Sequence, residues 1–331
     1  VFLFTILAFC NRMSSIEVKM MEVKKSIVPQ IMTILLVALM ILMSEVFHEK
    51  EFIFPEITAL TIGAWLAPKQ VWKTNKIKLV FLIAAYASLG IILVKYVDID
   101  IYFKILIGFV VCVTGLFLSK TTFAPLISAT ILPIIINSES WLYPLFATAM
   151  SILIVIGQQY LEKGGYRSVQ EYHPVTAAVK ETYSLNLKRL CALALTAFIA
   201  LQLKLLFLIA PPLIVAFVEL SSNHPKLRHN SIKLAFVTFI CAFSGAYGRI
   251  LISEIGDLPL TISAIIIVMI MLSIMKITKL YFPPAGALAI LPLLIESGKL
   301  IVYPFVIIGG FVIFTVFAFI ITKTPLNSLS K

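Results

Sequence analysis

Long apolar runs follow one another along almost the whole chain, and they constrain the fold more than any other feature of the sequence. Most of these runs hold about 16–22 residues, and only short polar stretches separate them. About 20 apolar residues form a helix that crosses a bilayer, whereas a transmembrane β-barrel shows alternating segments of about 10 residues. Hydrophobic residues make up 60% of the chain and charged residues 13%. The sequence therefore predicts an all-α, polytopic transmembrane helical bundle in a lipid bilayer.

Twelve membrane spans are expected, and four of them are short and contain proline. The spans are predicted at residues 27–47, 52–67, 79–97, 102–119, 122–136, 141–161, 187–202, 205–220, 232–252, 258–275, 280–295 and 300–321. The short spans are the second, fifth, eighth and eleventh. A short, proline-interrupted apolar segment is a common mark of the substrate site in a transporter.

The chain is expected to divide into two membrane units with polar segments around them. The predicted parts are an N-terminal cytoplasmic segment 1–25, a first membrane repeat 26–161, a cytoplasmic linker 162–186, a second membrane repeat 187–322 and a C-terminal tail 323–331. Residues 1–12 precede the candidate start residues Met13, Met20 and Met21, and we interpret them as translated upstream of the true start. A fragment of a signal sequence is the alternative.

Basic residues gather on one side of this predicted topology. With a cytoplasmic N-terminus, twelve spans place 21 of the 27 Lys and Arg residues in inner loops or at inner span ends. Lys and Arg favour the cytoplasmic side of membrane proteins. The pattern predicts a multi-pass protein of the plasma membrane with both termini in the cytoplasm. The net charge of +11 then reflects these loops, and we expect no nucleic-acid partner.

Paired motifs indicate an internal repeat with an offset of about 155–160 residues. Phe123–Pro133 matches Phe282–Pro292, Tyr143-Pro144 matches Tyr303-Pro304, and the segments that end at Gly90 and Gly245 also match. Pro55 corresponds to Pro211, and Pro68 corresponds to Pro225. Because six spans are an even number, both units enter the membrane in the same direction. We expect parallel repeats related by an axis along the membrane normal.

The second unit resembles the HPP family of integral membrane proteins. The resemblance lies in Ala210-Pro-Pro212, Asn223-His-Pro-Lys-Leu-Arg228, Ser244-Gly245 and Phe282-Pro-Pro-Ala-Gly286. The family is named for a His-Pro-Pro motif, and Phe282 stands here in place of the histidine. Phe123-Ala-Pro125 looks like a diverged copy of the motif. Functionally assigned members are associated with nitrite transport across plastid and cyanobacterial membranes, so the resemblance implies transport of a nitrite-like anion.

The proline-opened spans predict where a substrate would bind. Proline starts a helix cleanly, and the first amides of a helix carry a partial positive charge. We expect the free amides of four short helices to converge on a cavity between the repeats, where an anion could bind. The expected substrate-binding residues are Pro55, Glu56, Thr58, Phe123, Pro125, Ser128, Pro211, Pro212, Phe282, Pro283, Pro284, Ala285 and Gly286. Helix kinking and close packing are the alternative roles for these prolines and small residues.

Three charged residues lie near or within apolar runs. Glu56 is either a functional intramembrane carboxyl group or a residue at the outer boundary. Glu219 is expected at the inner boundary. Arg249 either neutralises an anion or extends its side chain to the outer surface.

Other functions find little support in the sequence. The four cysteines stand alone in apolar surroundings and are expected to be small buried residues. The four histidines lie in predicted loops, and we assign no metal or cofactor. Walker, GxSxG, HExxH and dinucleotide motifs are absent from the sequence, so we expect no enzyme. The leading prediction is a permease for a small anion, compatible with a homo-oligomer, and the alternative is a non-transporting membrane scaffold or assembly protein.

Overall fold

The computed structural model describes residues 2–169, 171–175, 179–222 and 225–322, and within this part of the chain all regular structure is helical. Within these described residues, eight helices are long and apolar enough to cross a membrane. They are α1 (Phe2–Phe47, with the apolar segment Lys25–Phe47), α3 (Lys76–Lys95), α4 (Ile101–Leu118), α6 (Leu142–Lys163), α7 (Val179–Gln202), α10 (Ser231–Arg249), α11 (Leu260–Thr278) and α13 (Tyr303–Thr322). The prediction of a polytopic helical bundle is confirmed at this level.

The four short predicted spans are short helices. They are α2 (Glu56–Thr61, continued by the π-helical turn Ile62–Leu66), α5 (Pro125–Ile136), α8 (Pro211–Leu220) and α12 (Pro283–Ile290, continued by the 3-10 turn Leu291–Leu293). Proline occupies the first turn of α5, α8 and α12, and Pro55 directly precedes α2. Proline fits there because its ring fixes a helical φ and its missing N–H would have no partner inside the helix.

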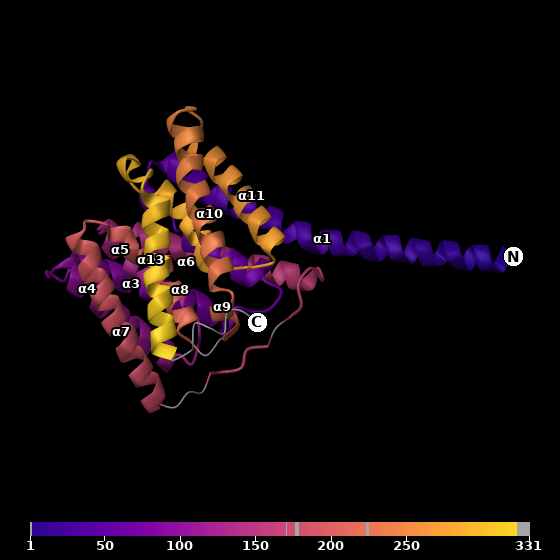
Figure 1. The fold of residues 1–331 in the computed structure, drawn as a ribbon. Helices are drawn as coiled ribbons and strands as arrows, with labels where there is room; N and C mark the ends of the chain where they lie inside the picture. Colours follow the sequence, from indigo (N-terminus) through magenta and orange to yellow (C-terminus); the bar gives the residue numbers. More distant parts are fainter. Residues whose placement is uncertain (1, 170, 176–178, 223–224, 323–331) are drawn as a thin grey trace.

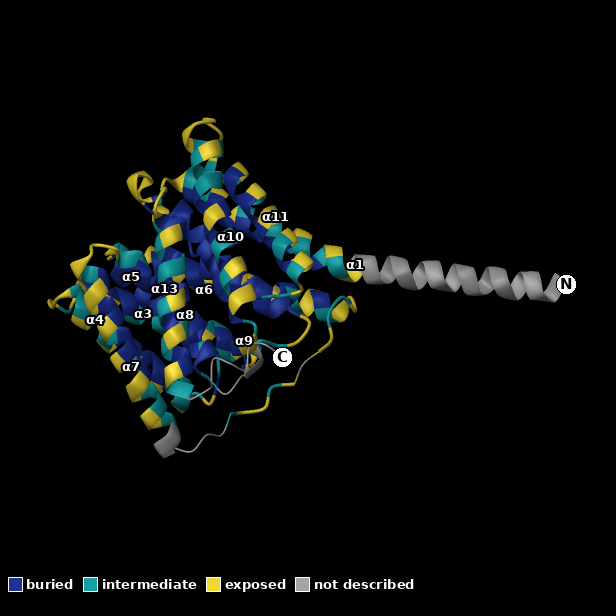
Figure 2. Ribbon diagram, in the orientation of Figure 1, coloured by how far each residue is buried: buried dark blue, intermediate teal, exposed yellow. Residues whose placement is uncertain are grey.

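Burial separates the short helices from the long ones. All residues of α2 and α12 are buried, as are all but one residue of α5 and all but one residue of α8. The long helices instead carry apolar side chains that are largely exposed, such as Phe81, Leu145, Ile232 and Phe305. Exposed yellow bands therefore lie along the outer helices, while the centre is dark blue (Figure 2). Exposed Phe, Leu and Ile on long helices suit contact with lipid.

The helices of the first half and of the second half make matching contacts. α3 packs against α5 and α6, and α10 packs in the same way against α12 and α13. Across the halves, α1 packs against α11 and α7 packs against α4. The short helices follow the same pattern, because α2 packs against α12 and α8 packs against α5. Figure 1 shows α10 beside α11 and α4 beside α7.

Two matched glycines allow long and short helices to approach closely. A Cβ atom on Gly90 of α3 would lie 2.5 Å from the Thr130 carbonyl oxygen of α5. A Cβ atom on Gly245 of α10 would lie 2.2 Å from the Ala289 carbonyl oxygen of α12. Each of these distances is shorter than a real carbon–oxygen contact. The segments paired by sequence therefore hold the same helix contact in both halves.

Two matched tyrosines satisfy backbone groups that proline leaves without a partner. Pro133 has no N–H to donate to the Ala129 carbonyl one turn earlier, and the Tyr143 hydroxyl donates to that oxygen at 3.1 Å. The Tyr303 hydroxyl donates to the Leu288 carbonyl at 2.8 Å, four residues before Pro292. A buried carbonyl needs such a donor because no water is available to it.

The structure refines the bounds of two predicted segments and corrects the expected burial of one cysteine. In the predicted span 280–295, α12 begins at Pro283, after the first three residues of the span. The expected linker 162–186 is helical at both ends, because α6 runs to Lys163 and α7 begins at Val179. Cys112 and Cys241 are buried as expected, but Cys191 is exposed on the apolar surface of α7.

Candidate functional site

The first turns of all four short helices line one small cavity. Each short helix contributes two or three residues, and the loop between α2 and α3 contributes one. The wall consists of Glu56, Ala59, Trp72, Pro125, Ser128, Pro212, Val215, Pro283, Pro284 and Ala287. The space that water could occupy is about 10 Å³, which is room for about one water molecule. The predicted convergence of proline-started helices is therefore present, around a cavity that is almost closed.

Six of the expected site residues lie in this wall. They are Glu56, Pro125, Ser128, Pro212, Pro283 and Pro284. Pro55, Thr58, Phe123, Pro211, Phe282, Ala285 and Gly286 are not part of it. Gly286 instead serves packing, because a Cβ atom there would lie 2.2 Å from Ile62 Cδ1 in the π-helical turn after α2. Phe282 is buried and packs edge-to-face on Phe311.

The expected free amides are not available to a ligand in this structure. At the start of α12, the Ala285 N–H donates to the Phe282 carbonyl at 3.1 Å. At the start of α8, the Leu213 N–H donates to the Ala210 carbonyl at 2.8 Å. Short bonds of this kind close the first turns of α2 and α5 as well, and proline removes a further amide from α5, α8 and α12. The positive ends of these three helices still point to the cavity, since the dipole comes from aligned peptide units.

Glu56 is the only charged residue in the cavity wall, and it is 1% exposed. Its Oε1 accepts a hydrogen bond from the Ser128 hydroxyl. Its Oε2 has no hydrogen-bond partner among the described residues, and neither has the hydroxyl of Thr58, two residues further along α2. Glu56 therefore lies inside the protein and not on its surface.

Sequence reasoning missed Trp72, which lies in the loop between α2 and α3 and is 4% exposed. Its indole N–H donates to Glu219 Oε1 at 2.9 Å, and its ring packs edge-to-face on Phe123. The ring also lies against Gly63, where a Cβ atom would be 2.3 Å from it. A tryptophan in a basic loop after an apolar span was the available signal, but only the fold shows that this loop turns inward.

Arginine side chains hold the C-terminal ends of α2, α8 and α12. Arg167 donates to the Ala67 carbonyl after α2, Arg189 to the Val218 carbonyl of α8, and Arg228 to the Leu220 carbonyl. Arg249 donates to the carbonyls of Pro292 and Ile295 after α12, and it also pairs with Glu254. These contacts cap the negative ends of helices. Arg249 is thus not placed to neutralise an anion in the cavity.

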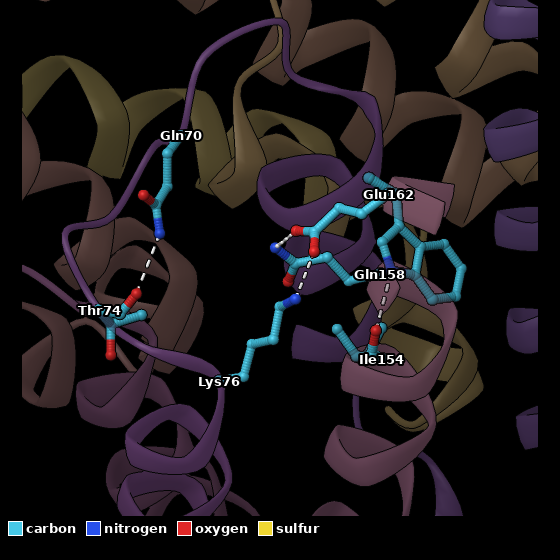
Figure 3. A network of polar contacts seen from close by, with 7 residues as sticks. Gln70, Thr74, Lys76, Ile154, Gln158 and Glu162 are labelled. Carbon is cyan, nitrogen blue, oxygen red and sulfur yellow. Dashed lines mark hydrogen bonds and ion pairs between the residues drawn. The ribbon is translucent and has the colours of Figure 1, made fainter. Parts of the chain in front are cut away.

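A polar network fixes α6 against the segments around α2 and α3. Lys76 pairs with Glu162, which also accepts from Gln158 at 2.9 Å, and the Trp65 indole donates to the Ile154 carbonyl at 3.0 Å (Figure 3). Gln70 donates to the Thr74 carbonyl in the loop that carries Trp72. The network therefore supports the loop and helices around the cavity without entering it.

A second, more polar pocket lies between α1, the end of α2 and the linker. Lys25, Gln30, Ala67, Arg167 and Tyr281 are among its lining residues. Burial lowers the pKa of Arg167, and nearby Glu162 partly offsets this effect. Within the described residues, no group of His, Cys, Asp and Glu side chains is arranged to hold a metal ion.

Comparison with known proteins found no match to a family model, a curated protein or a solved structure. The resemblance to the HPP family therefore stays a prediction from the motifs.

Proposed function

We propose that this chain is a multi-pass membrane permease whose substrate path runs through the central cavity. The observation that carries this proposal is the meeting of four short, buried helices around one cavity that contains a single intramembrane carboxyl group. Short helices and buried ionisable residues at the centre of a bundle are typical of transporters. Burying an ionisable side chain in the middle of a membrane protein costs free energy. A scaffold that transports nothing would have no need of that buried group.

The twelve helical segments form two parallel six-span repeats in this proposal. The matching contacts of α3 with α5 and of α10 with α12 support this arrangement. The close helix contacts at Gly90 and Gly245 support it as well. The cross-packing of α2 on α12 and of α8 on α5 fits an approximate two-fold axis through the cavity. The basic inner loops favour the plasma membrane with both termini in the cytoplasm.

A small anion is the proposed substrate. The positive ends of α5, α8 and α12 face the cavity and favour negative charge, and the HPP resemblance points to a nitrite-like anion. Recognition by free amides is not part of the proposal, because those amides are bonded within the first turns. The hydroxyl of Ser128 and the carboxyl group of Glu56 are the side-chain polar groups that an anion would meet.

Uptake into liposomes that contain the purified protein tests this proposal. Nitrite and nitrate are suitable probes. Nitrate is the stricter one, because nitric acid is a strong acid and leaves almost no neutral form that could cross the lipid without a protein. We expect uptake above empty liposomes, and we expect Ala287→Leu to abolish it by filling the cavity wall. Ala85→Leu, on the exposed face of α3, is the matched control and should keep uptake. Absence of uptake for every anion tried would favour the scaffold.

A further inference from the structure

The carboxyl group of Glu56 is left incompletely satisfied at the centre of the protein. Ser128 supplies one donor to Oε1, while Oε2 has no partner among the described residues. Both residues lie in the cavity wall, and each is 1% exposed. The side chain thus offers an unpaired oxygen next to the space that the substrate would occupy.

No basic side chain in the described part of the chain balances this group. The helices α5 and α12 and the π-helical turn after α2 carry no titratable residue. On α6, Tyr143 donates to the Ala129 carbonyl, and Glu162 and Lys163 lie at the far end of the helix. On α1, the described charged side chains are Lys25 and Glu45, and Glu45 accepts from the backbone of Leu260 and Thr261. Across the cavity, Trp72 is bonded to Glu219.

An unbalanced carboxylate at this position would be costly. A buried charge without a partner costs several kcal/mol even after relaxation, and three positive helix ends offset only part of that cost. A metal cation would need several oxygen ligands, whereas the wall offers mainly proline rings, alanines and one hydroxyl. A proton needs only the free Oε2, so it suits the site better.

We propose, on the basis of the permease function above, that Glu56 carries the proton of a proton–anion symport. The proton from one side of the membrane binds the carboxylate and gives a neutral carboxylic acid, which can donate a hydrogen bond to the anion. After the anion leaves on the other side, the carboxyl group releases the proton there, so charge and protons balance. By linkage, each ligand raises the affinity of the site for the other.

Liposomes with a pH gradient and a clamped membrane potential test the symport. At equal nitrate concentrations, one proton per nitrate predicts about tenfold accumulation for each pH unit of inward gradient, because one pH unit corresponds to a tenfold change in equilibrium. We expect Glu56→Gln, which keeps a neutral donor, to transport nitrate without accumulation. Glu51→Gln, a nearby carboxyl outside the cavity wall, should behave as the wild type.

A second measurement avoids dependence on the variants. Nitrate addition to weakly buffered liposomes that contain the wild-type protein and a pH dye should acidify the interior in step with nitrate entry. Nitrate uptake without acidification and without response to the gradient would overturn the role of Glu56 but keep the permease. The same holds if Glu56→Gln retains accumulation. No nitrate or nitrite uptake by the wild type would instead overturn the proposed function.

Discussion

The hydrogen bond of Tyr143 with the Ala129 carbonyl offers a sharp test of how the short helices are stabilised. Tyr143→Phe removes only the hydroxyl, because the ring contact with Phe54 at 5.7 Å remains available to phenylalanine. Tyr143 is 0% exposed, so water cannot replace the lost donor. Leaving a buried carbonyl unpaired costs about 1–3 kcal/mol, and hydrogen bonds measured within membranes reach about 1.7 kcal/mol. We therefore expect a loss of about 1–2 kcal/mol in the free energy of unfolding.

A double-mutant cycle identifies the cause of that loss. Pro133→Ala restores the N–H that an α-helix would donate to the Ala129 carbonyl, so the carbonyl keeps a donor when Tyr143 is changed. The cost of Tyr143→Phe should then fall below about 0.5 kcal/mol, which gives a coupling of about 1 kcal/mol. The reasoning is refuted if Tyr143→Phe costs the same with and without Pro133.

Thermal unfolding in detergent provides the assay. The buried thiols of Cys112 and Cys241 react with a fluorogenic maleimide only when the bundle opens, while exposed Cys191 gives a constant background. A loss of about 1 kcal/mol lowers the Tm of a chain of this size by about 2 °C. Tyr96→Phe, at a residue that is 64% exposed, is the control and should leave the Tm unchanged.

Two further predictions test the close packing and the closed cavity. Gly310→Ala should destabilise the protein by about 1–3 kcal/mol relative to Gly309→Ala. A Cβ atom at residue 310 would clash with the Leu208 carbonyl oxygen at 2.3 Å, whereas a Cβ atom at residue 309 would make an ordinary contact of 3.5 Å with the Leu208 side chain. Equal Tm values for the two variants would contradict this. Trp72→Ala should expose the cavity. A cysteine introduced by Ala287→Cys should then react with a small thiosulfonate at least about tenfold faster than it does in the protein that keeps Trp72. Equal reaction rates would show that Trp72 does not close the cavity.

The sequence was informative wherever a local rule decides the structure. Proline starts helices, so the start of α12 at Pro283 and of α5 at Pro125 could be predicted, and the short apolar runs indicated that these helices are short. The repeated motifs also predicted contacts, because Gly90 and Gly245 approach matching carbonyls. These features depend on residues close together in the chain or on a pattern that occurs twice.

Features that depend on distant contacts were missed or assigned wrongly. Free amides were expected at the cavity, but the carbonyls just before each short helix accept those N–H groups. Arg249 was considered as an anion partner, yet its guanidinium group donates to the Pro292 and Ile295 carbonyls after α12. Trp72 went unnoticed because nothing in its own loop shows that Glu219, 147 residues later, accepts its N–H. Each of these outcomes follows from satisfying buried polar groups, which a single span cannot reveal.

In the proposed symport, the asymmetry of the cavity accounts for a stoichiometry of one proton per anion. Pro125 and Pro284 bring the matched helices α5 and α12 to the cavity, but Glu56 of α2 has Pro212 of α8 as its counterpart in the repeat. A second carboxyl group at residue 212 would lie in the same wall, and two like charges there would raise the cost of ionising either. Proline instead leaves the second half without a charge and without an N–H at that position. In the proposed symport, four short helices from the two halves would frame the cavity, and its single carboxyl group would set the stoichiometry at one proton per anion.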